Sequence, residues 1–230
     1  TPFGILRDES AAQRAVRKGT VTEVTFDDTV LLLNFDGSNG ATTTTDGSNF
    51  TSNQVITFNG TSEISTSQNK FGGSSLKLTT DGFVTVADRP ELDLTYQDFT
   101  VEWWEYRTST SGNPTAIARN NDTFAPYIIG KAVSARNKAF ITHDGTSYSA
   151  TDGLDIDMGS IDLNQWNHFA LSRKGGSFRS FKNGAIVSTI ERPELFVRVS
   201  SDSLQIGKGQ GGNFFEGFID GLVITRGTAK

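Results

Sequence analysis

The sequence predicts an all-β protein whose antiparallel strands form a two-layer jelly-roll sandwich. The chain has 24 glycines and only 5 prolines among 230 residues, a composition typical of short strands joined by tight turns. Roughly thirteen segments with a side-chain period of two follow one another along the chain. Because each sheet of this kind has one apolar face to bury, we expect two sheets to pack face to face.

The clearest strand signals lie in the C-terminal half of the chain. Residues 166–173 alternate with a period of two, which places successive side chains on opposite faces of a strand. A Lys-Gly-Gly-Ser turn then leads to a second strand at residues 178–182. Asn183-Gly184 supplies another tight turn, and the β-branched run at residues 185–190 completes a predicted three-stranded antiparallel meander.

Further strands are predicted on both sides of this meander. Residues 30–35 are almost all apolar, which suits a strand covered on both faces. Residues 99–106 form the predicted central strand, with Trp103 on one face and Trp104 on the other. One face fills the core, and the other is either buried under a loop or lines a concave surface. Shorter strands are expected at residues 75–78, 83–87, 116–119, 125–130, 138–142, 203–207 and 214–225.

The first residues differ in composition from the rest. We expect an N-terminal arm and connector at residues 1–29, followed by one sandwich domain at residues 30–230. The hydroxyl of Ser10 and a glutamine three residues later have capping-box spacing, which predicts a short helix from Asp8 or Ser10 to Lys18. This arm either packs on its own domain or docks onto a larger particle.

Motifs spread over most of the chain resemble the laminin-G-like, concanavalin A-like lectin/glucanase superfamily. In order they are LLLNFDG (31–37), KFGGSSLKL (70–78), FTVEWW (99–104), W-x-H-x-A-x-x-R-x-G with its following N-G turn (166–184), and FFEGFIDGLVITRG (214–227). The F-D-G and F-G-G-S-S-L versions are most similar to those of bacteriophage virion and tail proteins. The resemblance implies a jelly-roll fold, which hosts many different activities.

Charge and cysteine content exclude several classes of function. The net charge is −5 with a pI near 5.1, and no basic run is present, so neither nucleic acid nor an anionic membrane surface is an expected partner. No apolar stretch reaches the ~20 residues that span a bilayer. Cysteine is absent, which excludes disulfides and cysteine-based metal or nucleophile chemistry.

Catalysis is not expected, although glucanases belong to the superfamily that the motifs resemble. A retaining glucanase needs two carboxylates about 5 Å apart on one face. Glu102 and Glu105 are three residues apart in one strand, so they lie on opposite faces. The chain has 2 histidines: we expect His168 to be hydrogen-bonded inside the sandwich and His143 to lie in an exposed turn.

Acidic side chains near glycine turns suit calcium in type. They are Asp36, Asp144, Asp152, Asp155 and Asp157. None completes a D-x-[DN]-x-[DN]-G loop, and calcium remains an alternative that only the family resemblance suggests. No cofactor is predicted.

A glycan site would combine aromatic platforms with planar polar groups. The candidate ligand-binding residues are Trp104, Tyr106, Tyr127, His143, Asp144 and Tyr148. Further hydrogen-bonding groups are available from Arg119, Asn120 and Asn121.

The functional hypothesis is a non-catalytic, phage-type virion module for capsid decoration or a tail fibre, whose lectin-like face binds a glycan or host surface. We expect it in the virion or outside the cell, as a homo-oligomer within an assembly, attached to other virion proteins by its N-terminal arm. The alternative is a purely structural or cementing subunit without sugar binding. An active glycoside hydrolase is the least favoured hypothesis, because Glu102 and Glu105 are on opposite faces of the strand.

Overall fold

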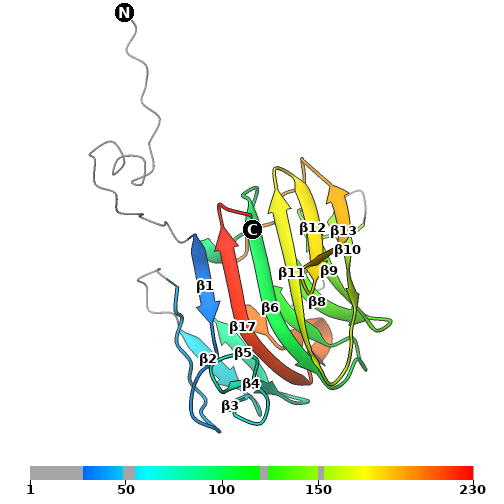
Figure 1. Cartoon of the computed structure of the whole chain (residues 1–230). Helices are drawn as coiled ribbons and strands as arrows, with labels where there is room; N and C mark the ends of the chain where they lie inside the picture. The colour runs from blue at the N-terminus through cyan, green and yellow to red at the C-terminus, as the bar shows by residue number, and fades with distance from the viewer. Residues whose placement is uncertain (1–27, 49–54, 120–123, 150–152, 230) are drawn as a thin grey trace, which may run out of the picture.

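The computed structural model describes residues 28–48, 55–119, 124–149 and 153–229 (Figure 1). Two antiparallel sheets form a sandwich, which confirms the predicted fold class. The predicted arm and its helix lie outside the described residues. Within the described ranges, no helix is long and apolar enough to cross a membrane.

Sheet A has eight strands, and most of them run in the order β13-β12-β11-β6-β17-β4-β3. Its members are β1 (Thr29–Leu33), β3 (Glu63–Ser65), β4 (Ser75–Leu78), β6 (Phe99–Arg107), β11 (Trp166–Lys174), β12 (Ser177–Lys182), β13 (Ala185–Glu191) and β17 (Gly217–Arg226). The predicted meander is β11-β12-β13, and its Asn183-Gly184 turn has positive φ at both residues. Positive φ at two central residues is what a tight hairpin turn requires.

Sheet B has seven strands in the order β10-β9-β8-β7-β14-β5-β2. Its members are β2 (Ile56–Asn59), β5 (Phe83–Val86), β7 (Thr115–Arg119), β8 (Tyr127–Val133), β9 (Arg136–Thr142), β10 (Gly153–Ser160) and β14 (Leu204–Ile206). A small ribbon of β15 (Lys208–Gly209) and β16 (Asn213–Phe214) and the short 3-10 turns η1 (Pro90–Leu92) and η2 (Gln210–Gly212) complete the described elements.

Strand β17 holds the start and the end of the sandwich together. Its first part pairs with β4 and its second part with β1, with a register shift after Asp220. Thr29 of β1 lies opposite Thr225 of β17, and the amide of Arg226 donates to the carbonyl of Asp28 at 2.9 Å. The chain therefore enters the sandwich and leaves it at the same corner (Figure 1).

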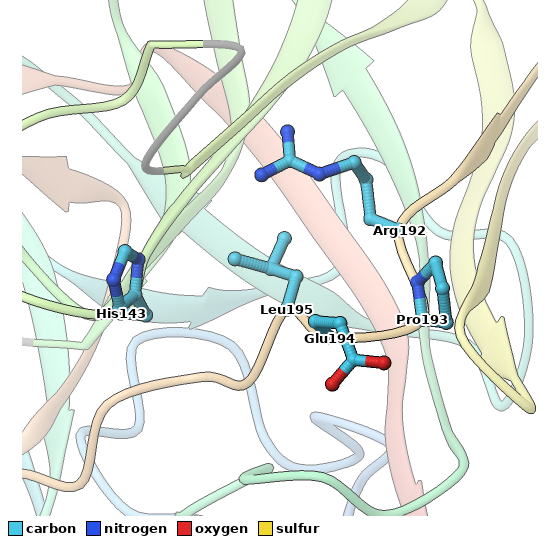
Figure 2. Close-up of a pocket in the computed structure, with 5 residues that line it drawn as sticks. All are labelled: His143, Arg192, Pro193, Glu194 and Leu195. Atoms are coloured by element: carbon cyan, nitrogen blue, oxygen red, sulfur yellow. The ribbon is translucent and has the colours of Figure 1, made fainter.

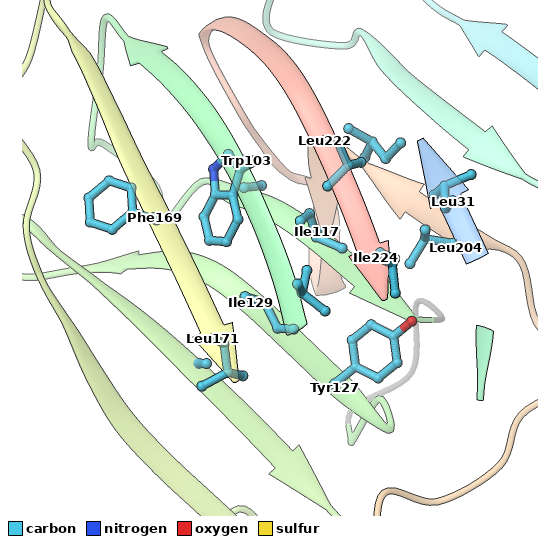
Figure 3. Close-up of a cluster of buried hydrophobic side chains, with 14 of the residues drawn as sticks. Leu31, Trp103, Ile117, Tyr127, Ile129, Phe169, Leu171, Leu204, Leu222 and Ile224 are labelled. Atoms are coloured by element: carbon cyan, nitrogen blue, oxygen red, sulfur yellow. The ribbon is translucent and has the colours of Figure 1, made fainter. Parts of the chain in front are cut away.

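The core lies between the two sheets. Figure 3 shows buried side chains from both layers meeting there, among them Leu31, Trp103, Ile117, Tyr127, Ile129, Phe169, Leu171, Leu204, Leu222 and Ile224. Trp103 stacks on Phe169 with ring centroids 5.8 Å apart. Aromatic side chains bury about 150–250 Å² each, so these rings supply much of the apolar area that holds the layers together.

The outer face of sheet B is largely closed over β7 and β8. Ala118, Ala125 and Ile128 are buried there beneath Phe140 and Tyr148. The Tyr148 hydroxyl donates to the carbonyl of Ala125 at 3.1 Å. The outer face of sheet A carries exposed and half-buried side chains instead, and the candidate site lies on this face.

Candidate functional site

The two carboxylates of the central strand lie on opposite faces, as the period of two predicts. Glu105 points into the core, where its carboxylate accepts hydrogen bonds from Trp103 Nε1 at 2.9 Å and from Arg107 at 3.0 Å. Glu102 points outward, beside His168. A retaining glycosidase needs both carboxylates within about 5 Å on one side of a sugar, and this pair does not provide that geometry.

The strand register arranges the outward side chains of sheet A in rows across β17, β6, β11 and β12. We call them the aromatic row (Phe218, Tyr106, Trp166), the Trp104 row (Asp220, Trp104, His168) and the Glu102 row (Val223, Glu102, Ala170, Phe181). Neighbouring rows are two residues apart along β6 and β11, which corresponds to about 7 Å.

The aromatic row presents three rings packed edge to face. The Tyr106 ring lies 5.8 Å from Trp166 and 5.9 Å from Phe218, centroid to centroid. All three side chains are partly exposed. Rings held at these angles form a rigid apolar strip that one edge of a ligand can contact.

Trp104 lies in the middle of the face and is framed by its neighbours. Its ring is 5.1 Å from His168 and 5.8 Å from Phe71, and the Lys70 ammonium lies 4.0 Å from its centroid. Asp220 holds this frame in place, because its Oδ2 atom accepts the backbone amides of Lys70 at 2.8 Å and Phe71 at 2.9 Å. Asp220 thus acts as a structural hydrogen-bond acceptor.

A hollow of about 160 Å³ lies next to Trp104 on the same face. Its lining residues are Thr100, Glu102, His168, Ala170, Phe181 and Gly184. The hollow lies over the methyl group of Ala170, because a small residue stands there between larger neighbours. Asn183 fixes the adjoining turn: its Oδ1 accepts the His168 amide, and its own amide donates to the His168 carbonyl, both at 2.8 Å.

His168 is not inside the sandwich, and this part of the prediction is wrong. Its inward neighbours Asn167 and Phe169 are buried, so the alternation of the strand turns the imidazole outward. Nε2 of His168 lies 3.3 Å from Oε2 of Glu102, and the two side chains are 21% and 22% exposed. The hollow therefore has a paired imidazole and carboxylate on one wall.

A second hollow, of about 280 Å³, lies among the loops at one end of the sandwich (Figure 2). Its lining residues are His143, Arg192, Pro193, Glu194 and Leu195. Figure 2 shows the Arg192 guanidinium and the Glu194 carboxylate on opposite sides of Leu195, so these charges do not converge. Arg192 Nη1 donates to the Gly153 carbonyl at 2.8 Å.

Asp144, next to His143, builds the turn in which it lies. Its carboxylate accepts the Thr142 hydroxyl at 3.0 Å and the Thr146 amide at 2.8 Å, as well as the Thr146 hydroxyl. The hydrogen bonds from Thr146 are the main reason why the pKa of Asp144 lies well below its usual range. The carboxylate therefore stabilises its own turn. The centroid of the His143 ring lies 5.5 Å from that of the Phe196 ring.

The predicted ligand-binding residues are distributed over four places. Trp104 and Tyr106 share the outer face of sheet A, His143 and Asp144 lie in the loops, and Tyr148 packs on sheet B. Tyr127 is fully buried in the core, where its hydroxyl donates to the Leu92 carbonyl at 3.2 Å, so it cannot contact a ligand.

Of the additional hydrogen-bonding groups, Arg119 is buried and paired with Asp88 and Asp93. Asn120 and Asn121 lie outside the described residues. The structure adds side chains that sequence reasoning did not select, namely Glu102, Trp166, His168, Ala170 and Phe181. The signal that could have found them is their shared parity with Trp104, combined with the register of β6 against β11.

The acidic side chains considered for calcium do not converge. Asp155 pairs with Lys138 at 2.9 Å and Asp157 with Arg136. Across the ranges that the structure describes, no group of three or more His, Cys, Asp or Glu side chains could hold a metal ion. Asp152 lies outside those ranges.

Comparison with solved structures shows the same fold in domains of other proteins. Domain 4 of AbnA, a GH43 extracellular arabinanase from Geobacillus stearothermophilus solved in complex with arabinotriose, is 18% identical with a TM-score of 0.67, covering 88% of this chain and 94% of that one. The binding domain of Paraclostridial Mosquitocidal Protein 1 is 13% identical with a TM-score of 0.66, covering 86% of this chain.

The binding domain of botulinum neurotoxin DC, solved in complex with SialylT, is 18% identical with a TM-score of 0.63 over 86% of this chain. The chain spans about half the length of the two toxin binding domains, 48% in each case. Comparison with curated proteins found none with a similar sequence. A family model described as the concanavalin A-like lectin/glucanases superfamily matches residues 78–228. As that match covers more than half of the sequence, the chain belongs to the concanavalin A-like lectin/glucanase superfamily.

Proposed function

We propose that this sandwich is a non-catalytic module that binds a glycan on the outer face of sheet A. The observation that carries the proposal is the alignment of the aromatic row, Trp104 and the hollow over Ala170 on one exposed surface. Sugar rings have apolar faces that pack on aromatic side chains, and hydroxyl groups at their edges that need polar partners. Glu102 and His168 lie where such partners are needed.

The spacing of the rows fits an extended ligand. Three rows span about 14 Å along β6, so an oligosaccharide lying along this strand would contact Tyr106, then Trp104, then the hollow. The likeness in fold to an arabinanase domain that was solved with arabinotriose supports a carbohydrate as the class of ligand. The second carboxylate of β6, Glu105, points into the core, which supports binding without cleavage.

Glycan-array binding by the intact protein tests the proposal. We expect binding that is lost in Trp104→Ala and Tyr106→Ala, with the thermal unfolding midpoint close to that of the wild type. Tyr96→Ala is the matched control, because Tyr96 is 59% exposed and lies in the loops against Phe196. Absence of binding to any glycan on a broad array would contradict the proposal, as would loss of binding in Tyr96→Ala alone.

We also propose a setting outside the cell or in a virion, for capsid decoration or a tail fibre. The F-D-G and F-G-G-S-S-L motifs support this, through their similarity to phage virion and tail proteins. Residues 1–29 would attach the module to other virion proteins, within a homo-oligomeric assembly. Deleting residues 1–19 should then release the protein from its particle, and unchanged occupancy would refute attachment by the arm.

A structural or cementing subunit without sugar binding is the second candidate. The observation that favours it is edge strand β13, which has no charged residue between 185 and 190 and exposes 60% of Ile186. Edges of this kind can pair with another chain. Two results together would support this candidate. The protein would bind no glycan on the array, and it would form a concentration-dependent oligomer that Ile186→Lys dissociates.

A further inference from the structure

The hollow over Ala170 has an unequal distribution of polar and apolar groups. Its floor is the Ala170 methyl group, and the half-exposed Phe181 ring forms one side. Polar groups lie along the β6 side, where the Glu102 carboxylate contacts His168. A ligand in this hollow therefore has an apolar face against Phe181 and Ala170 and a polar edge toward Glu102.

The chemistry of Glu102 restricts that polar edge. An ionised carboxylate is an acceptor with about four lone-pair sites, so Glu102 can accept from His168 and from a ligand hydroxyl at the same time. A ligand carboxylate at this position would bring two like charges together in a partly desolvated site, which is unfavourable. Hydroxyl donors fit the hollow, and carboxylates do not.

The cations of this face do not reverse the argument. The Lys70 ammonium lies 4.0 Å from the centroid of the Trp104 ring, and Lys70 is not among the residues that line the hollow. Arg179 lies opposite Ser172, one row (about 7 Å) beyond Ala170, and is exposed to solvent. Within the lining of the hollow, the charged group beside His168 is the carboxylate of Glu102.

We propose that this hollow takes one uncharged sugar ring, whose hydroxyls donate to Glu102 and whose apolar face packs on Phe181, and that it rejects sugars bearing a carboxylate. The inference rests on the proposed glycan-binding function and names its ligand class. The hollow has a volume of about 160 Å³, which limits it to a single sugar ring.

The test compares matched neutral and acidic oligosaccharides by calorimetric titration of the full chain. The probes are lactose against 3′-sialyllactose, and arabinotriose against trigalacturonate. We expect each neutral member that binds to do so at least tenfold more tightly than its acidic counterpart. Glu102→Gln should weaken the neutral probe about tenfold, since a charge-assisted hydrogen bond becomes a neutral one, and should narrow the neutral-to-acidic ratio.

Two further variants locate the binding in the hollow. Ala170→Leu fills it and should weaken the neutral probe at least tenfold, and Phe181→Ala removes one side and should do the same without filling it. Thr189→Leu is the control, because Thr189 lies on the same sheet beside Arg179, outside the hollow. Unfolding midpoints show whether each variant is folded.

The outcomes separate this inference from the proposed function. Unchanged neutral-sugar affinity in both Ala170→Leu and Phe181→Ala would overturn the hollow as the site while leaving glycan binding intact. Tighter binding of the acidic probes would overturn the ligand class. Absence of binding to every array glycan would overturn the proposed function and this inference together.

Discussion

The guanidinium of Arg107 lies 3.0 Å from the carboxylate of Glu105, and both side chains are completely buried between the two sheets. The carboxylate also accepts from Trp103 Nε1 at 2.9 Å and from the amide of Asn137 at 3.0 Å. Arg107 donates in addition to the carbonyl of Pro114 at 3.1 Å. Each charge is therefore hydrogen-bonded within the core, as buried charges need to be.

Glu105→Ala should lower the free energy of unfolding by about 3–5 kcal/mol, because it leaves the Arg107 charge buried without its partner. Urea-induced unfolding measures the change. Glu63→Ala is the control: it breaks a partly exposed ion pair between a carboxylate and the ammonium of Lys77, at 2.8 Å, and should cost less than about 1 kcal/mol. Equal losses in the two variants would show that burial is not what makes the Glu105 pair important.

Gly130→Ala should destabilise the fold by more than the conformational cost of a positive φ alone. Gly130 has φ of 75°, and an added methyl carbon would lie 2.6 Å from the Trp103 indole. Overpacking of this kind costs about 1–3 kcal/mol. Gly40→Ala isolates the conformational part, because Gly40 has a similar φ of 81° with no atom within 4 Å of the added carbon. Equal unfolding midpoints for the two variants would contradict the close approach of Trp103.

The stability of Asp220→Asn relative to the wild type should increase as the pH rises. Burial raises the pKa of Asp220, and the charge of Asp36 adds to this effect. The folded pKa is then above the unfolded value of about 3.9, so the wild type has its full stability from this group below that value and loses it as the pH rises through the folded pKa. Asparagine does not titrate, so the measurement is the difference in unfolding free energy between the two proteins from pH 3 to 8.

For Asp157→Asn we expect the opposite pH dependence of stability relative to the wild type. Its hydrogen bond from Arg136 lowers the pKa of Asp157, so its contribution is present above about pH 3.9 and is lost as the pH falls through the folded pKa. This variant should be less stable than the wild type at pH 7, with the gap closing in acid. Parallel pH profiles for the two variants would contradict at least one of the two assignments.

Tyr127→Phe should cost about 0.5–1.5 kcal/mol of stability and leave glycan binding unchanged. It removes the hydrogen bond to the Leu92 carbonyl, in a site where burial raises the pKa of the phenol well above its usual range. Thermal unfolding and array binding measured on the same preparation check both parts. Altered array binding in a folded variant would show that this core position does influence the ligand.

The fold followed from local patterns in the sequence, but the site did not. The period of two and the Asn183-Gly184 turn are properties of neighbouring residues, so they predict strands and hairpins directly. The hollow depends instead on Ala170 lying opposite Glu102, and Trp104 opposite His168. That register joins segments far apart in the sequence, and a shift of one residue would exchange the two faces.

The wrong prediction of Tyr127 as a ligand-binding residue also has a physical reason. Tyr127 belongs to a strand whose first four residues are buried on both sides, because Phe140 and Tyr148 cover its outer face. Parity alone cannot distinguish core from surface in such a strand.

The shared corner at which β1 and β17 meet also determines how the sandwich responds to mechanical load. Tension applied through the two flanks acts across the pair that begins with Thr29 and Thr225, and the hydrogen bonds of antiparallel strands lie perpendicular to the strands. Such a pull would peel the bonds apart one at a time, as in unzipping, rather than shear them together. A tether on one flank alone leaves that seam unloaded, so the domain is better suited to hang as a pendant side branch than to serve as a link in a chain under tension.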